Sequence, residues 1–343
     1  MSRIQSVDVL RVAAIVAVIV IHTIPFATSV PIGEQFDLAT LVQMPTRFAV
    51  PFFFILSGYF WAQKLASQQE IVAPTMAMLK RIAFLFFVWS AIYLLPTNLF
   101  EAFQYGPLGP VKQVYWNAVT AVSNPLDTVM QGTKEHLWFL MGLLWSLAIS
   151  AVLLRYKQTW LLLPLAIALY VIGLTGKAYS DSPLGFQIDF NFRNGPFFSL
   201  IFFVTGYLLY RKPSRPAWFP IGLTIAVLGF FLQFAELWTL HQQWGTSLGQ
   251  DYVIGTYFFG LGIAMMGLSG SRYLDFPSAA AIGPLVLGIY ASHCIVIDFL
   301  KPLGRHFAGN WIWSAAQVGV VFFLAYALAR LMVKSGVTRK MVM

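Results

Sequence analysis

Ten long stretches without Asp, Glu, Lys or Arg dominate this 343-residue chain. Each is close to the roughly 20 residues that an α-helix needs to cross the hydrocarbon core of a membrane. Lipid offers no hydrogen-bond partner to backbone amides, so a spanning segment must satisfy them internally, as a helix does. The strands of a lipid-facing barrel would alternate polar and apolar residues, and these stretches do not. The stretches are residues 12–33, 48–63, 82–100, 137–154, 158–176, 194–210, 216–235, 252–271, 276–297 and 307–329. We therefore predict an all-α, polytopic membrane bundle of about ten transmembrane helices.

The composition excludes several other classes of protein. Only 10% of the residues are charged and 58% are hydrophobic, whereas soluble domains carry about a quarter charged residues. The net charge of +9 does not predict a nucleic-acid partner, because the basic residues cluster in short loops between apolar stretches. The single cysteine, Cys294, predicts neither a disulfide nor a thiolate metal site, and we expect its thiol to be inert. No Walker-type or dinucleotide-binding glycine motif is present, and we expect no permanently bound cofactor.

The lysine and arginine residues predict the orientation. When the amino terminus is placed inside, most of the 22 basic residues fall on the cytoplasmic side, so both termini are predicted to be cytoplasmic. The first stretch has a basic start and small residues after Pro25, as a secretory signal would, but its apolar run is long for one. We predict a single integral-membrane domain over residues 1–343, with residues 101–135 outside and partly along the membrane surface.

The helix predicted over the first stretch and the residues just before it carries the most informative ionisable residues, because charged groups inside a span are costly and are candidates for function. Asp8 and Arg11 are three residues apart and therefore neighbours on one helical face. Arg11 and His22 share a face about 16 Å apart along the axis. A guanidinium near the cytoplasmic mouth suits phosphate, and a deeper imidazole suits proton abstraction from a hydroxyl. The alternative is structural: Arg11 extends to the interface and His22 hydrogen-bonds a neighbouring helix.

Further candidates lie at the ends of other stretches. Arg47 begins the second stretch on the outer side, where it would bind an anionic acceptor or anchor the helix. Glu135 and His136, at the outer mouth of the fourth, would assist His22 or orient an acceptor. A structural hydrogen bond is the favoured role of His293. Close helix packing is the favoured role of Ser57-Gly58, and a nucleophilic Ser57 is the alternative. The five histidines are too scattered to show metal-ligand spacing, so no metal is predicted.

Several blocks, in order along nearly the whole chain, resemble one family. Asp8-x-x-Arg11 followed by His22 resembles the first-helix signature of the acyltransferase-3 family of membrane acyltransferases. Four other blocks also resemble that family: residues 47–59 (RFAVPFFFILSGY), residues 136–140 (HLWFL), residues 202–207 (FFVTGY) and residues 288–293 (GIYASH). Lys80-Arg81 at the start of the third stretch fits as well.

The resemblance implies an integral-membrane enzyme that takes an acyl group, acetyl in the simplest case, from cytoplasmic acyl-CoA. It implies transfer to a sugar hydroxyl of a polysaccharide or lipid-linked glycan, at the cytoplasmic (inner) membrane of a bacterium. His22 matches the family's proposed catalytic histidine and Arg11 its essential arginine. The predicted catalytic residues are therefore His22, Arg11 and Asp8, those contacting acyl-CoA are Arg11, Lys80 and Arg81, and those contacting the acceptor are Arg47, Glu135 and His136.

Two alternatives stay open at this point. Ten spans with buried charges and interior Pro and Gly also suit a transporter or exporter of a glycan or a small polar solute. A structural partner in a glycan-synthesis complex is the other alternative. Within the enzyme hypothesis, direct attack with His22 as general base and a covalent acyl-histidine intermediate are both compatible with the sequence.

Overall fold

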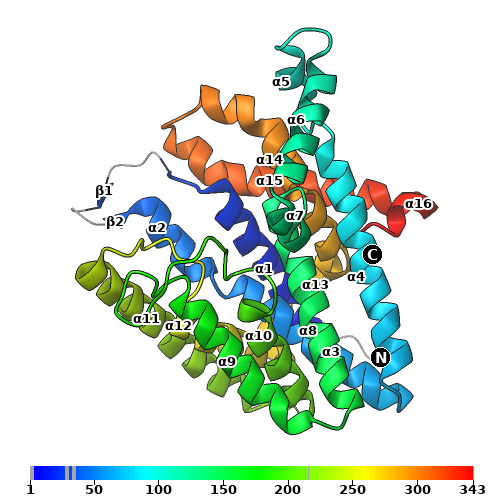
Figure 1. Cartoon of the computed structure of the whole chain (residues 1–343), viewed down its shortest axis with the longest axis vertical. Helices are drawn as coiled ribbons and strands as arrows, with labels where there is room; N and C mark the ends of the chain where they lie inside the picture. Colours follow the sequence, from blue (N-terminus) through cyan, green and yellow to red (C-terminus); the bar gives the residue numbers. More distant parts are fainter. Residues whose placement is uncertain (1–3, 28–30, 33–35, 213, 215, 343) are drawn as a thin grey trace. The chain divides into compact units, whose positions relative to one another are not determined.

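A computed structural model describes residues 4–27, 31, 32, 36–212, 214 and 216–342 (Figure 1). The end of the first apolar stretch, where signal cleavage after Pro25 would fall, and the basic residues Arg3 and Arg215 therefore lie outside the described residues. The chain forms two compact units, each built from three segments of sequence. The first contains the chain up to Ala14, Met44–Ala83 and Phe139–Gly283, and the second contains Ile15–Gln43, Phe84–Trp138 and the chain from Pro284 onward.

The described part of the first unit is helical throughout its regular structure. Its elements are α1 (Gln5–Thr23) up to Ala14, η1 (Met44–Thr46), α3 (Ala49–Gln68), α4 (Val72–Leu94) up to Ala83, α8 (Trp138–Arg155) from Phe139, η3 (Thr159–Leu161), α9 (Leu162–Thr175), α10 (Pro196–Tyr210), α11 (Trp218–Trp244), α12 (Ile254–Leu268), η4 (Arg272–Leu274) and α13 (Pro277–Ile282). Helices α11 and α12 lie side by side along their length, and α10 packs on both α3 and α9 (Figure 1).

Close backbone contact between α3 and α10 depends on two glycines. A Cβ atom added at Gly58 of α3 would lie 1.9 Å from the carbonyl oxygen of Phe203. A Cβ at Gly206 of α10 would lie 1.9 Å from the carbonyl oxygen of Ile55. Small residues of this kind let helices approach closely where no hydrophobic effect drives their association. The packing role predicted for Gly58 is therefore confirmed.

The second unit holds the remaining helices and the only strands among the described residues. Its elements are the rest of α1, β1 (Pro31–Ile32), β2 (Phe36–Asp37), α2 (Leu38–Gln43), the rest of α4, α5 (Leu99–Phe103), α6 (Gly109–Ser123), α7 (Pro125–Gln131), η2 (Glu135–Leu137), α14 (Val286–His306), α15 (Trp311–Lys334) and α16 (Gly336–Arg339); η5 (Gly283–Leu285) begins at the last residue of the first unit. The two strands pair antiparallel, and α14 packs along α15.

The prediction of an all-α membrane protein is confirmed at this level. Seven of the described helical segments are long and apolar enough to cross a membrane. The other three predicted stretches fall on the shorter apolar helices Thr159–Thr175, Pro196–Tyr210 and Ile254–Leu268. The count of ten spans and the cytoplasmic termini stay predictions.

The end of the ninth apolar stretch differs from the prediction. Helix α14 continues past Asp298 to His306, although the charges there suggested an end before Asp298. Asp298 accepts from Lys134 at 2.7 Å and from Lys301 at 2.7 Å, so its charge is compensated within the fold and the helix continues.

Candidate functional site

Three histidines from distant parts of the sequence meet in the second unit. His22 lies in the last turn of α1, His136 in η2 and His293 in α14. The ring centroid of His22 lies 6.2 Å from that of His136 and 5.1 Å from that of His293. The rings of His136 and His293 are also 5.1 Å apart. We call these three residues the histidine cluster.

Hydrogen bonds from backbone and tyrosine groups hold two members of the histidine cluster. The Nδ1 atom of His293 lies 2.6 Å from the carbonyl oxygen of Tyr290, one turn earlier in α14. The hydroxyl of Tyr290 donates to the carbonyl oxygen of His136. The ring of Tyr93 packs edge-on to His136, and its hydroxyl donates to the carbonyl oxygen of Ala291 at 2.7 Å. These contacts connect α4, η2 and α14 around the cluster.

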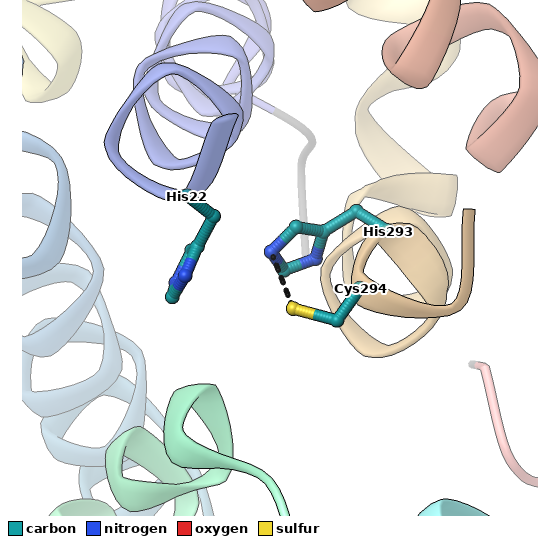
Figure 2. Close-up of side chains that lie close together, drawn as sticks. All are labelled: His22, His293 and Cys294. Atoms are coloured by element: carbon teal, nitrogen blue, oxygen red, sulfur yellow. Dashed lines mark hydrogen bonds between the residues drawn. The ribbon is translucent and has the colours of Figure 1, made fainter. Parts of the chain in front are cut away.

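Cys294 also faces the cluster. Figure 2 shows His22 at the end of α1 and His293 and Cys294 side by side on α14, with their side chains converging. The Sγ atom of Cys294 lies 3.4 Å from Nε2 of His293, and the thiol is buried.

His136 is the least satisfied member of the cluster. Its side chain is only 2% exposed, and neither ring nitrogen has a hydrogen-bond partner. Buried polar atoms are almost always paired, so an exception calls for a functional or ligand-based explanation. A polar molecule or ion that enters the cluster would find an unused donor or acceptor there.

A cavity of about 330 Å³ reaches His22. Its wall also includes Lys301 and Arg305 of α14 and Trp313, Ser314 and Gln317 of α15. Hydroxyl, amide and indole groups are suited to a hydroxyl-rich molecule, since they combine hydrogen bonding with an apolar face. We call this the His22 cavity.

A second cavity, of about 370 Å³, lies in the same unit and is more polar. It shares Lys301 with the His22 cavity and includes Glu101, Lys134, Glu135 and Asp298. Helices α6 and α7, from the predicted outer segment 101–135, supply amide and hydroxyl side chains to its wall. The exposed Glu135 also lines this cavity.

Asp8 and Arg11 form an ion pair on the first half of α1. The Arg11 Nη1 atom lies 3.0 Å from Oδ1 of Asp8, whose side chain is 5% exposed, whereas that of Arg11 is 32% exposed. The guanidinium also lies over the Phe60 ring, 5.2 Å from its centroid. The carboxylate thus holds an arginine that keeps part of its surface accessible. Arg11 precedes His22 on the same helix by eleven residues, or about 16 Å along the axis.

The remaining predicted residues lie in the first unit. Lys80 and Arg81 are exposed on α4. Arg47, just before α3, pairs with Asp251 at 3.4 Å. Asp251 also accepts from Lys177 at 3.0 Å and lies 3.7 Å from Arg193. Arg47 is therefore one member of a group of three cations around one carboxylate.

Sequence reasoning underrated two residues of the site. His293 was expected to make a structural hydrogen bond, which it does, but it also contacts His22 and His136. Cys294 was expected to be inert, which stays a prediction, and its thiol contacts His293 of the cluster. The one sequence signal for this turn of α14 was the family-like block of residues 288–293 (GIYASH). Spacing along the chain could not show that His293 lies near His22.

Comparison with known families identifies the family of the chain. The profile of the acyltransferase-3 family, described as an acyltransferase domain, matches residues 4–330, which includes every residue of the histidine cluster. The chain belongs to this family of acyltransferases.

Relatives of known name are called racemases rather than acyltransferases. An amino-acid racemase of Enterococcus faecalis is 30% identical over 226 residues, which are 62% of this chain and 29% of that protein. A serine/alanine racemase of Enterococcus gallinarum is 28% identical over 254 residues, which are 68% of this chain and 33% of that protein. The chain thus spans about a third of the length of these relatives. No solved structure matches the chain significantly.

Proposed function

We propose that this protein transfers an acyl group, acetyl in the simplest case, from acyl-CoA to a hydroxyl of a carbohydrate acceptor. The observation that carries the proposal is the position of His22, in the wall of a cavity and beside two further imidazoles, in a chain of the acyltransferase-3 family. The protein would cross the cytoplasmic membrane of a bacterium ten times, with both termini inside, as one acyltransferase domain over residues 1–343.

In the proposed reaction His22 is the general base. One ring nitrogen accepts the proton of the acceptor hydroxyl while its oxygen attacks the thioester carbonyl carbon. The carbon–sulfur bond breaks, the ester forms, and the CoA thiolate takes the proton from His22. Base and reacting hydroxyl must come within hydrogen-bond reach, and the His22 cavity has room for a sugar-sized group beside the ring.

The acyl donor is proposed to bind through the cations of the first unit. Arg11, fixed by Asp8, would contact a CoA phosphate, and the exposed Lys80 and Arg81 would contact others. Arginine suits this role because its planar guanidinium binds phosphate oxygens in pairs. The distance of about 16 Å between Arg11 and His22 along α1 is similar to the length of an extended pantetheine arm.

The acceptor is proposed to be a polysaccharide or a lipid-linked glycan. Glu135 and the ring nitrogens of His136 would orient it near His22, and the polar cavity would hold further hydroxyl groups. Arg47, within its group of cations around Asp251, would favour an acceptor that carries an anionic group.

The test uses purified full-length protein, acetyl-CoA binding by calorimetry, and slow acetyl-CoA hydrolysis followed by release of the free thiol. We expect Arg11→Ala to lose binding and His22→Ala to bind normally but to turn over about 10²- to 10⁴-fold more slowly. His241→Ala is the matched control, because this histidine bonds the Thr246 carbonyl at 2.9 Å outside the cluster. Near-normal turnover in His22→Ala would exclude His22 as the base.

Transport of a small polar solute is the second candidate. The names of the relatives, which concern serine, alanine and amino acids generally, make an amino acid the solute to test. If the wild-type protein neither binds nor hydrolyses acetyl-CoA, while vesicles containing it take up serine or alanine, transport replaces acyl transfer.

A further inference from the structure

We propose that His22, His293 and Cys294, with His136 as the fourth ligand, bind one divalent transition-metal ion of the Zn²⁺ type. All four residues belong to the second unit. This inference does not depend on the proposed acyl transfer, because it concerns metal binding by the protein alone.

The geometry of the potential ligand atoms is close to that of a metal site. One ligand atom each from His22, His293 and Cys294 lie within 4.8 Å of one another. The Sγ atom of Cys294 and Nε2 of His293 are 3.4 Å apart. Two ligands on a tetrahedral zinc, with bonds of about 2.3 Å to sulfur and 2.0 Å to nitrogen, are about 3.5 Å apart. The Cys294–His293 pair is therefore already at the separation that a shared ion requires, and the His22 ligand atom lies within 4.8 Å of both.

The hydrogen bond of His293 leaves the correct nitrogen available. Its Nδ1 atom faces the carbonyl oxygen of Tyr290 at 2.6 Å and must therefore carry the ring proton. Nε2 then accepts the hydrogen bond of the Cys294 thiol at 3.4 Å, and its lone pair becomes available to a metal when that thiol loses its proton. Metal-binding histidines usually donate their other N–H to such a carbonyl or carboxylate, which fixes the ring and its tautomer.

His136 supplies independent support for a ligand. It is 2% exposed, both ring nitrogens lack hydrogen-bond partners, and its ring contacts those of His22 and His293. A metal ion bonded to one of these nitrogens would satisfy a buried atom that the protein alone leaves unpaired. Three imidazoles and one thiolate make up a four-ligand set.

The ligand types select the ion. Imidazole and thiolate favour zinc and its neighbours in the first transition row, whereas Mg²⁺ and Ca²⁺ prefer oxygen ligands. The His22 cavity reaches one of the four proposed ligands, His22. On binding, the Cys294 S–H bond breaks, its proton goes to solvent, and a metal–sulfur bond forms.

Metal binding has a consequence for activity if the proposed function holds. A His22 nitrogen that coordinates an ion cannot accept a proton from a hydroxyl, so the metal-bound protein would be inactive in acyl transfer. Zn²⁺ would therefore inhibit the enzyme, and a chelator would restore its activity.

The experiment titrates Co²⁺ into the chelator-treated full-length protein, purified in detergent through a tag free of histidine and cysteine. Cys294 is the only cysteine of the chain, so a thiolate-to-cobalt charge-transfer band can arise only from this residue. We expect a band that saturates at one ion per chain and that Zn²⁺ removes by displacing Co²⁺. Cys294→Ser and Cys294→Ala should both abolish the band, with cooperative thermal unfolding confirming that each variant folds.

The histidine variants complete the test. We expect His293→Gln and His136→Gln to weaken Co²⁺ binding by at least about 10-fold, the smallest loss typical even for outer-sphere partners of a metal ligand. His306→Gln, on the same helix but exposed, should bind as the wild type does. A wild-type protein without the band, or an unchanged affinity in His293→Gln, would overturn the site. Neither result involves acyl-CoA, so the proposed acyltransferase activity would stand or fall separately.

Discussion

Asp251 is placed among three cations, and its ionisation depends on them. Burial alone would raise the pKa of this carboxyl group, but Arg193, Arg47 and Lys177 outweigh burial and lower it to about 2. A carboxyl whose pKa falls on folding stabilises the folded protein above its unfolded pKa of about 4. This stabilisation is lost as the pH falls from about 4 towards 2, and it amounts to about 2 kcal/mol.

We expect Asp251→Asn to unfold at a lower temperature than the wild type at neutral pH, because three cations then lack their carboxylate. The difference between the two proteins should shrink as the pH falls from about 4 to 2. Tryptophan fluorescence during heating, recorded across that pH range, measures it. Asp127→Asn, at an exposed carboxylate of the other unit, is the control. A difference in unfolding temperature that is the same at every pH would show that the charge of the Asp251 carboxylate does not stabilise the folded protein.

Local spacing predicted one part of the candidate site and could not predict another. The Asp8–Arg11 contact follows from a separation of three residues in a helix, and the structure has it at 3.0 Å. His22, His136 and His293 are separated by more than a hundred residues at each step, so only tertiary packing brings them together. The histidines show no metal-ligand spacing along the sequence, and such spacing could not have revealed that His293 lies beside His22 and His136.

At the level of elements, apolar length predicted the helices well, because lipid imposes the same requirement on every span. Their mutual packing was far less predictable. Gly58 suggested a close contact, but its partner Gly206 lies almost 150 residues further on, and nothing local identifies α10 as the helix that α3 meets.

The glycine contact between α3 and α10 gives a prediction with an internal control. Gly58→Ala places a Cβ atom 1.9 Å from a carbonyl oxygen of α10, so the helices must separate, at a cost of about 1–3 kcal/mol. Gly319→Ala makes the same chemical change on α15, where no atom lies within 4 Å of the new Cβ. There we expect stabilisation of up to about 1 kcal/mol, from higher helix propensity.

Thermal unfolding of the purified variants measures both effects. Gly58→Ala should lower the unfolding temperature, and Gly319→Ala should raise it or leave it unchanged. Equal destabilisation by both would mean that glycine flexibility, rather than close packing, explains Gly58.

For the molecule as a whole, the number of helices that cross the membrane determines which loops face the cytoplasm. If α9, α10 and α12 cross together with the seven longer spans, the loop at Asp189 lies outside and that at Arg272 lies inside. If only the seven longer helices cross, both assignments are reversed, and the carboxyl terminus moves outside. The distribution of basic residues predicts the arrangement with ten spans. Helix length alone favours the arrangement with seven, because α10 and α12 have 15 residues each, fewer than the roughly 20 of a full span.

Cysteine labelling decides between these arrangements, since Cys294→Ala removes the only native cysteine. In that background we expect Asp189→Cys to react with a membrane-impermeant maleimide in intact cells, and Arg272→Cys to react only after permeabilisation. Asp127→Cys and Lys157→Cys are the outer and inner controls, because both arrangements place them on the same sides; all four positions are exposed. A short helix spans if the bilayer thins around it or if flanking side chains extend to the interface, at a modest cost per ångström of mismatch. Labelling of Arg272→Cys in intact cells would place its loop outside. The shorter helices α9, α10 and α12 would then not cross the membrane, and the positive charges would not set the topology.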